Sequence, residues 1–149
     1  MRLRVDGHPA AEALRIHGSA DAEAGEGLVF APRPDIADWA AAEEELAEAF
    51  RLTQAAFATP APVVYLVEAR ALLGRADPLP AAVAAGLLGG ARALAFEGRK
   101  AEAFATVIAI GEGAPVDRVS DAVGCAVANR TGNGQVVTVG AEHLGAMFP

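Results

Sequence analysis

The sequence contains only one phenol and one ammonium side chain, and 35 residues separate them. There is one tyrosine, Tyr65, and one lysine, Lys100. Tyr65 lies in an apolar run that predicts a buried strand, whereas Lys100 follows a long helical pattern. A phenol and an ammonium group that act together in proton transfer must lie side by side. This pair therefore predicts no proton-transfer site.

Residues that could bind a metal are also scattered. His8, His17 and His143 have no metal-ligand spacing among themselves or with Cys125, so we expect no metal site. His143 follows Glu142, and such a neighbouring pair is more often a surface or interface hydrogen bond than an acid–base couple.

Two glutamates are the best candidates for a residual site. Glu68 directly follows the apolar run 63–67, and Glu112 follows the apolar run 104–110. Both runs predict strands, and ligands of open α/β sheets bind beyond the carboxyl ends of the strands. We therefore expect Glu68 and Glu112 to line a cleft. By contrast, Glu43, Glu44 and Glu45 are most simply interpreted as the solvated start of a helix.

The composition argues against several classes of protein. A length of 149 residues fits one domain, residues 1–149, and the net charge of −7 argues against nucleic-acid binding. Charges, glycines or prolines interrupt every apolar run, so we expect no membrane span, and an acidic residue before any apolar stretch leads us to expect no secretory signal at the N-terminus. One cysteine cannot form an internal disulfide. Together these features indicate a cytoplasmic protein.

Short apolar runs alternate with helical patterns along the chain. Predicted strands cover residues 2–5, 27–31, 63–67, 104–110 and 135–139. Predicted helices cover residues 9–16, a segment from Asp35 or Asp38 to Ala58, and residues 79–97 and 115–129. Such alternation gives a parallel sheet. With right-handed crossovers, it predicts a three-layer α/β/α domain with about five strands.

The predicted helix 79–97 carries a stripe of small residues. Ala82, Gly86, Gly89 and Ala93 recur at i, i+4, i+7 and i+11, which places them on one helix face. A glycine inside a helix costs about 1 kcal/mol relative to alanine, so close approach of another element is the expected reason for keeping it. The stripe could pack against the sheet of its own domain or against a second subunit.

From Gly27 to Gly140 the chain resembles the short-chain dehydrogenase/reductase (SDR) family. Five segments carry the resemblance, in the family's order: residues 50–56, 91–95, 107–113, 117–127 and 134–139. The resemblance implies a Rossmann-like fold. It also implies that the two long helices form a four-helix bundle across a two-fold axis, to which Leu46, Phe50 and Phe57 would belong together with the small-residue stripe.

The departures from the family fall on the positions that do its chemistry. The resemblance aligns the family's catalytic tyrosine and lysine with Pro80 and Ala84. The family's serine falls near Val67, where Glu68 is the only polar neighbour. The family's active-site asparagine aligns with Glu45, and the proline of its Pro-Gly turn with Glu112.

The nucleotide-binding features of the family are also missing. The first predicted strand ends in residues 6–9 (Asp-Gly-His-Pro), without the Gly-rich turn that approaches a dinucleotide pyrophosphate. The chain is too short for the two further strand–helix units of the nucleotide-binding half. The resemblance therefore implies a truncated scaffold with no catalytic residues, no cofactor-binding residues and no cofactor.

These observations lead us to expect a non-catalytic SDR-like protein that acts through association. Its partner would be a second copy of the chain or an active dehydrogenase subunit. Two alternatives stay open: a module that binds a nucleotide or acyl compound near Glu68 and Glu112, and an oxidoreductase completed by a partner subunit.

Overall fold

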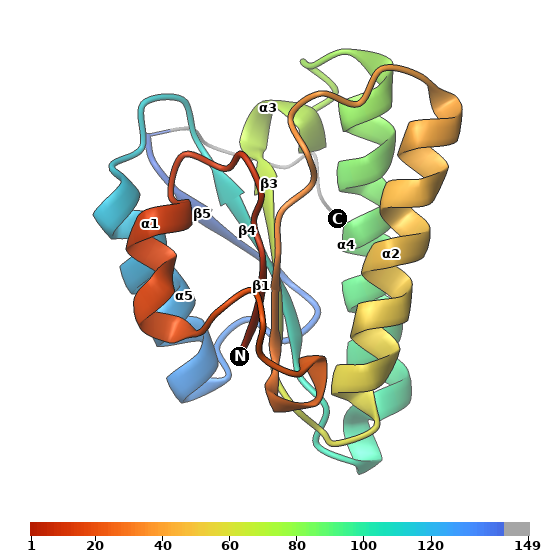
Figure 1. Ribbon diagram of the computed structural model, residues 1–149, viewed down its shortest axis with the longest axis vertical. Helices are drawn as coiled ribbons and strands as arrows, with labels where there is room; N and C mark the ends of the chain where they lie inside the picture. The colour runs from red at the N-terminus through yellow and green to blue at the C-terminus, as the bar shows by residue number, and fades with distance from the viewer. Residues whose placement is uncertain (142–149) are drawn as a thin grey trace.

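A five-stranded parallel sheet forms the centre of the protein, with helices on both of its faces (Figure 1). The computed structural model describes residues 1–141. The strands lie side by side in sequence order, β1-β2-β3-β4-β5. Their bounds are β1 Arg2–Arg4, β2 Leu28–Phe30, β3 Val63–Glu68, β4 Ala105–Ile110 and β5 Val136–Val139. The predicted α/β fold class is therefore confirmed, including the number of strands.

The helices divide between the two faces of the sheet. Helices α2 (Trp39–Phe57) and α4 (Pro78–Glu97) lie side by side on one face, and α1 (Ala11–Leu14) and α5 (Val116–Asn129) cover the other. A short helix, α3 (Ala69–Leu72), and 3₁₀ turns at Arg15–His17, Ala24–Glu26 and Gly98–Lys100 complete the elements of the described residues.

The expectation that every crossover is right-handed is wrong. The strands are parallel and follow one another in order across the sheet, so crossovers on opposite faces have opposite hands. The β4–β5 crossover runs through α5, on the face opposite α2 and α4. Both faces of the central strands are apolar, so helices must cover both of them.

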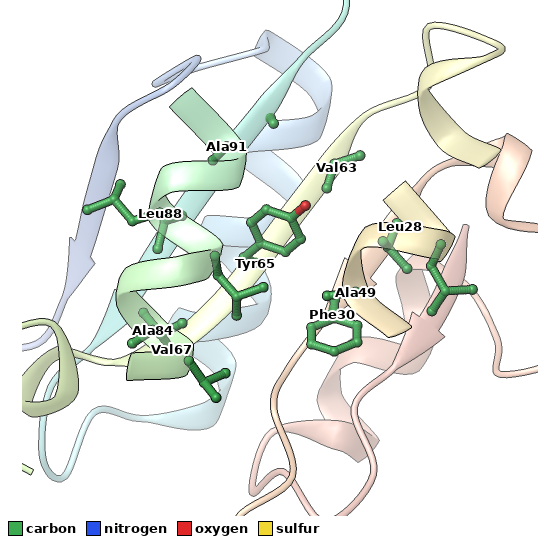
Figure 2. Packing of buried hydrophobic residues seen from close by; sticks show 14 of the residues in the cluster. Leu28, Phe30, Ala49, Val63, Tyr65, Val67, Ala84, Leu88 and Ala91 are labelled. Atoms are coloured by element: carbon green, nitrogen blue, oxygen red, sulfur yellow. The ribbon is translucent and has the colours of Figure 1, made fainter. Parts of the chain in front are cut away.

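Alternate residues of each strand supply two separate cores. Val64, Leu66 and Ile108 face α1 and α5, whereas Tyr65 and its neighbours on the opposite face pack against α2 and α4. Figure 2 shows Tyr65 between these two helices. Its ring meets that of Phe30 edge to face, with the centroids 6.4 Å apart. The helices contribute small side chains to this core, such as Ala49 and Ala91, so large residues of the sheet fill the space between them.

Helix α2 begins where Asp38 accepts a hydrogen bond from the backbone N–H of Ala41 (2.8 Å), which confirms one of the two predicted N-caps. Six residues of α2 are buried against the sheet: Ala42, Glu45, Ala49, Leu52, Thr53 and Ala56. The larger apolar residues predicted to form one face lie at the side of this surface. Leu46 and Phe57 are half-buried, and Phe50 is 63% exposed.

In helix α4 the small-residue stripe faces away from the sheet. The helix buries Val83, Ala84, Leu87, Leu88 and Ala91. With 3.6 residues per turn, these side chains lie opposite the stripe formed by Ala82, Gly86, Gly89 and Ala93. Packing against the domain's own sheet, one of the two predicted explanations of the stripe, is therefore wrong.

By length and composition alone, one helix of the described chain is apolar enough to cross a membrane, the stretch Pro78–Lys100. The prediction that charges, glycines or prolines interrupt every apolar run is wrong for this stretch. Pro78 and Pro80 are accommodated in the first turn of α4, and the internal glycines remain helical. The same test is met by helices that pack on a sheet, as α4 does with one side.

Candidate functional site

A cavity of about 500 Å³ lies at the carboxyl ends of β1 to β4. Its walls come from the segments that follow these four strands and from the first turns of α4 and α5. Both predicted cleft residues, Glu68 and Glu112, line it. The volume is in the range that binds small molecules, and the location is the edge where α/β sheets bind ligands.

The positions aligned with the family's catalytic residues lie in this cavity too. Pro80, Ala84 and Val67 all line its wall. They present apolar groups where the resemblance implies a phenol, an ammonium group and a hydroxyl. The tyrosine and lysine that the chain does contain lie elsewhere.

Tyr65 is a core residue. Its hydroxyl lies 2.6 Å from Thr53 Oγ1, and burial raises its pKa, partly opposed by this hydrogen bond. Lys100 lies in the 3₁₀ turn after α4, beyond the opposite edge of the sheet. The two side chains cannot share one site.

A buried ion-pair network lies beside the cavity, and it corrects the prediction that Glu45 is solvated. The Glu45 side chain is 0% exposed. Its Oε1 lies 2.7 Å from Arg4 Nη1 and its Oε2 lies 2.8 Å from Arg4 Nη2. Arg33 donates from its backbone N–H (2.9 Å) and from Nε (2.8 Å). The carboxylate therefore has a partner for each of its roughly four lone-pair positions.

The rest of the network surrounds Arg4. Its Nη2 also contacts Glu48 at 2.8 Å, its Nη1 donates to the carbonyl of Ala31, and its guanidinium lies 4.8 Å from the centroid of the Phe30 ring. Sequence reasoning missed this cluster. The available signal was that Arg4 and Glu45 each occupy the buried face of their element, where an unpaired charge is too costly.

The network sets the charge state of Glu45. Burial by itself raises the pKa of the Glu45 carboxyl, but hydrogen bonds from Arg4 and Arg33 and the charge of Arg4 oppose it, and the net pKa lies below the ordinary value. The carboxylate is therefore ionised at neutral pH. Arg33 is held against it by two hydrogen bonds, and its side chain also lines the cavity.

His8 also lines the cavity. Burial lowers its pKa, so its ring is neutral at neutral pH. Its Nδ1 accepts a hydrogen bond from the backbone N–H of Ala10 (3.1 Å), so the proton resides on Nε2. The ring can therefore donate a hydrogen bond through Nε2 but cannot act there as a base.

The turn after β1 does not fit a dinucleotide cofactor. The N–H of His8 donates to Val5, that of Ala10 to the His8 ring and that of Ala11 to the His8 carbonyl, and Pro9 has no N–H. Helix α1, which follows this turn, has only four residues. A pyrophosphate needs several free amides at a helix N-terminus, and this turn has occupied N–H groups at His8, Ala10 and Ala11 and none at Pro9.

The structure leaves the two cleft glutamates unpaired. Within residues 1–141, neither Glu68 nor Glu112 forms a salt bridge or a side-chain hydrogen bond. The same part of the chain contains no group of three or more His, Cys, Asp or Glu side chains that could hold a metal. Glu142 and His143 lie outside the described residues.

The predicted interface residues form a second candidate site, on the outer side of α2 and α4. Leu46 packs over Gly86, where an added Cβ would lie 2.8 Å from the leucine Cδ2, and Phe57 packs over Gly98. A Cβ added at Gly89 would have no atom from elsewhere in residues 1–141 within 4 Å. We call this surface the α2–α4 face; its members are Trp39, Leu46, Phe50, Phe57, Ala82, Gly86, Gly89, Ala93 and Phe96.

Comparison with known proteins establishes the fold. No protein-family model matches the sequence, and no curated protein is significantly similar to it. The structure is similar to the crystal structure of an oxidoreductase of the short-chain dehydrogenase/reductase family from Burkholderia thailandensis, with a TM-score of 0.55 and 17% sequence identity. The likeness covers 75% of this chain and 62% of that chain, which is less than two thirds of the oxidoreductase. The protein has an SDR-like, Rossmann-like fold.

Proposed function

We propose that this protein is a non-catalytic SDR-like protein that acts through association of its α2–α4 face with a second copy of the chain. The observation that carries the proposal is the exposure of α4. This helix is the one long, apolar helix of the described chain, yet only 28% of its most apolar stretch is buried. A surface of this kind marks an interaction site in a folded protein.

Large apolar side chains add to the exposed surface of the two helices. Trp39 is 64% exposed, Phe50 63% and Phe96 68%. Aromatic residues are enriched in protein interfaces, where they contribute much of the binding energy. Three of the five large hydrophobic residues that are exposed in residues 1–141 lie on the α2–α4 face.

The spacing of these residues favours a second copy as the partner. In α4, the order Ala82, Gly86, Gly89, Ala93 reads the same from either end. A two-fold axis that packs α4 antiparallel on itself would therefore place Ala82 opposite Ala93 of the other copy, and Gly86 opposite Gly89. The interface of a two-fold dimer must be self-complementary in this way.

Helix α2 has the same symmetry. Trp39 and Phe57 are equally far from the midpoint of the helix, as are Leu46 and Phe50. Antiparallel packing across the same axis would bring Leu46 against Phe50 of the other copy and Trp39 against Phe57. Small residues along α4 allow the backbones to approach closely, while the apolar side chains of α2 fill the flanking space.

The chemistry of the cavity supports the non-catalytic part of the proposal. Pro80, Ala84 and Val67 cannot donate or accept a proton through their side chains, and they line the cavity where the resemblance implies the catalytic groups. The turn after β1 has a proline at position 9 and occupied N–H groups at His8, Ala10 and Ala11, which does not suit a dinucleotide.

Substitution of Phe50 tests the proposal. Phe50→Glu places a charge in the α2–α4 face at an exposed position, and Ile16→Glu is the matched control because Ile16 is 80% exposed and lies outside that face. Sedimentation equilibrium is expected to show a dimer for wild type and Ile16→Glu, and a monomer for Phe50→Glu. If Phe50→Glu dimerises as tightly as wild type, the α2–α4 face is not the dimer interface. If the chain associates only with an added active dehydrogenase, the partner is a heterologous subunit instead.

A second candidate function is the binding of a small molecule in the cavity. The observation that favours it is a cavity of about 500 Å³ whose lining includes Glu68 and Glu112, both without a protein partner in residues 1–141. A ligand raises the stability by about 2.7 kcal/mol when its concentration is a hundred times its dissociation constant. Thermal unfolding in the presence of candidate ligands tests this function separately from association.

A further inference from the structure

Two donors and two carboxylates of the cavity follow different strands of the sheet. Donors follow the first two strands, His8 after β1 and Arg33 after β2, and carboxylates follow the next two, Glu68 at the end of β3 and Glu112 after β4. Neighbouring strands are about 5 Å apart, so the strand ends that carry Arg33 and Glu112 are about 10 Å apart. Arg70, two residues after Glu68 in α3, adds a cation on the β3 side, so the difference in charge is between the end that carries Arg33 and the end that carries Glu112.

Arg33 is oriented before any ligand binds. Its Nε donates to Glu45 at 2.8 Å and its backbone N–H donates to the same carboxylate, which is fully buried. The two terminal nitrogens of the guanidinium make no hydrogen bond within the part of the chain that the structure describes, and the side chain is 44% exposed. A guanidinium held at Nε presents its remaining N–H groups in a fixed, planar arrangement that suits a carboxylate.

The charges of the cavity balance. Arg70 is the remaining charged residue of the lining, and its Nη2 donates to the carbonyl of Arg75. Arg33 and Arg70 oppose Glu68 and Glu112, so the lining has no net charge. A polyanion such as a nucleoside diphosphate would meet the two carboxylates with like charge, whereas a dipolar molecule would match both ends.

We propose that the cavity binds a small zwitterion of the ω-amino carboxylate class. Its carboxylate is bound by Arg33 and by the Nε2–H of His8, and its ammonium group lies at Glu68 and Glu112. The apolar linker of such a molecule packs against apolar lining residues such as Leu66 and Ile110. This inference rests on ligand binding, the second candidate function, and is independent of association through the α2–α4 face.

Isothermal titration calorimetry with three probes tests the proposal. Aminohexanoate carries both charged groups, hexanoate lacks the amine and hexylamine lacks the carboxylate. Aminohexanoate is expected to bind at least about tenfold more tightly than either of the others, since each missing group removes a charge-assisted interaction. Equal affinity for hexanoate or hexylamine, or no heat with any probe, would overturn the proposal.

Two variants test which end of the cavity binds the carboxylate and which binds the ammonium group. Arg33→Gln and Glu112→Gln are each expected to weaken aminohexanoate about tenfold, and Glu112→Gln to leave hexanoate unchanged. Arg99→Gln, an exposed position outside the cavity, is the control. Glu112 has no partner in residues 1–141, so Glu112→Gln tests the site without disturbing the fold. Unchanged binding of aminohexanoate by Glu112→Gln contradicts the proposed ammonium site. Because light scattering measures association separately, a failure here leaves the dimer proposal intact.

Discussion

Replacing the buried carboxylate of Glu45 tests how the ion-pair network holds α2 to β1. Glu45→Ala leaves Arg4, which is 5% exposed, without its bidentate partner. Removal of one member of a buried ion pair costs about 3–5 kcal/mol. Arg4 keeps Glu48, the carbonyl of Ala31 and the Phe30 ring. These contacts place the expected loss near the lower end, at about 3 kcal/mol.

Urea unfolding followed by circular dichroism measures this loss. Total stabilities of about 5–15 kcal/mol mean that about 3 kcal/mol is a large fraction, equal to a shift of the midpoint of roughly 1–3 M urea. Glu44→Ala is the matched control, because Glu44 is the preceding residue and is exposed, and it should change the stability by no more than about 0.5 kcal/mol. If Glu45→Ala unfolds at the same midpoint as Glu44→Ala, the carboxylate is not part of a buried network and the reasoning is wrong.

Two further measurements separate loss of the ion pair from a general defect. The double variant Arg4→Met/Glu45→Leu replaces the pair with apolar side chains and should recover most of the stability, since such replacements are often neutral or stabilising. The pKa of Glu45 is lower in the folded protein than in the unfolded chain. Its contribution is therefore complete above the unfolded value of about 4.3 and is lost as the pH falls through the folded value. The stability of Glu45→Ala should therefore fall less steeply than that of wild type as the pH is lowered, because the variant lacks the contribution of the Glu45 carboxylate.

Three other substitutions or titrations test separate parts of the structure. Gly89→Leu should leave the monomer folded, because an added Cβ meets no atom from elsewhere in residues 1–141 within 4 Å. The same variant should abolish dimerisation as measured by light scattering. Ala128→Leu changes an exposed position on α5 and is the control, which should still dimerise. Tyr65→Phe should lower the stability by about 1–2 kcal/mol in urea unfolding, because it removes a buried hydrogen bond to Thr53; an unchanged midpoint would contradict that bond. The pKa of the His8 ring, measured by proton NMR titration, should lie below the ordinary value of about 6.5, because burial disfavours the charged form. A pKa at or above about 6.5 would show that the ring is solvated.

The sequence predicted most elements because their signals are local. The apolar run 63–67 and the helical pattern 79–97 correspond closely to β3 and α4. Asp38 and the prolines after Ala58 mark the ends of α2 by well-understood capping and termination effects. The cleft glutamates could be placed because the carboxyl ends of parallel strands meet at one edge. Which face each helix covers depends on contacts between distant segments, and the sequence did not predict the position of α5.

The parts that sequence reasoning missed depend on pairings across the fold. Glu45 follows two other glutamates in a helix start, a pattern that normally indicates solvent exposure. Its burial requires Arg4, 41 residues away in β1. The orientation of Arg33 depends in turn on Glu45. The direction of the α4 stripe could not be decided either, because both sides of that helix are apolar and only the packing of the sheet distinguishes them.

The mass of the wild-type chain in solution tests the central claim most directly. Size-exclusion chromatography with light scattering at micromolar concentration should give twice the chain mass of 15.1 kDa. A mass of 15.1 kDa across that concentration range, with no dehydrogenase subunit that restores a larger complex, would contradict association as the function of the α2–α4 face.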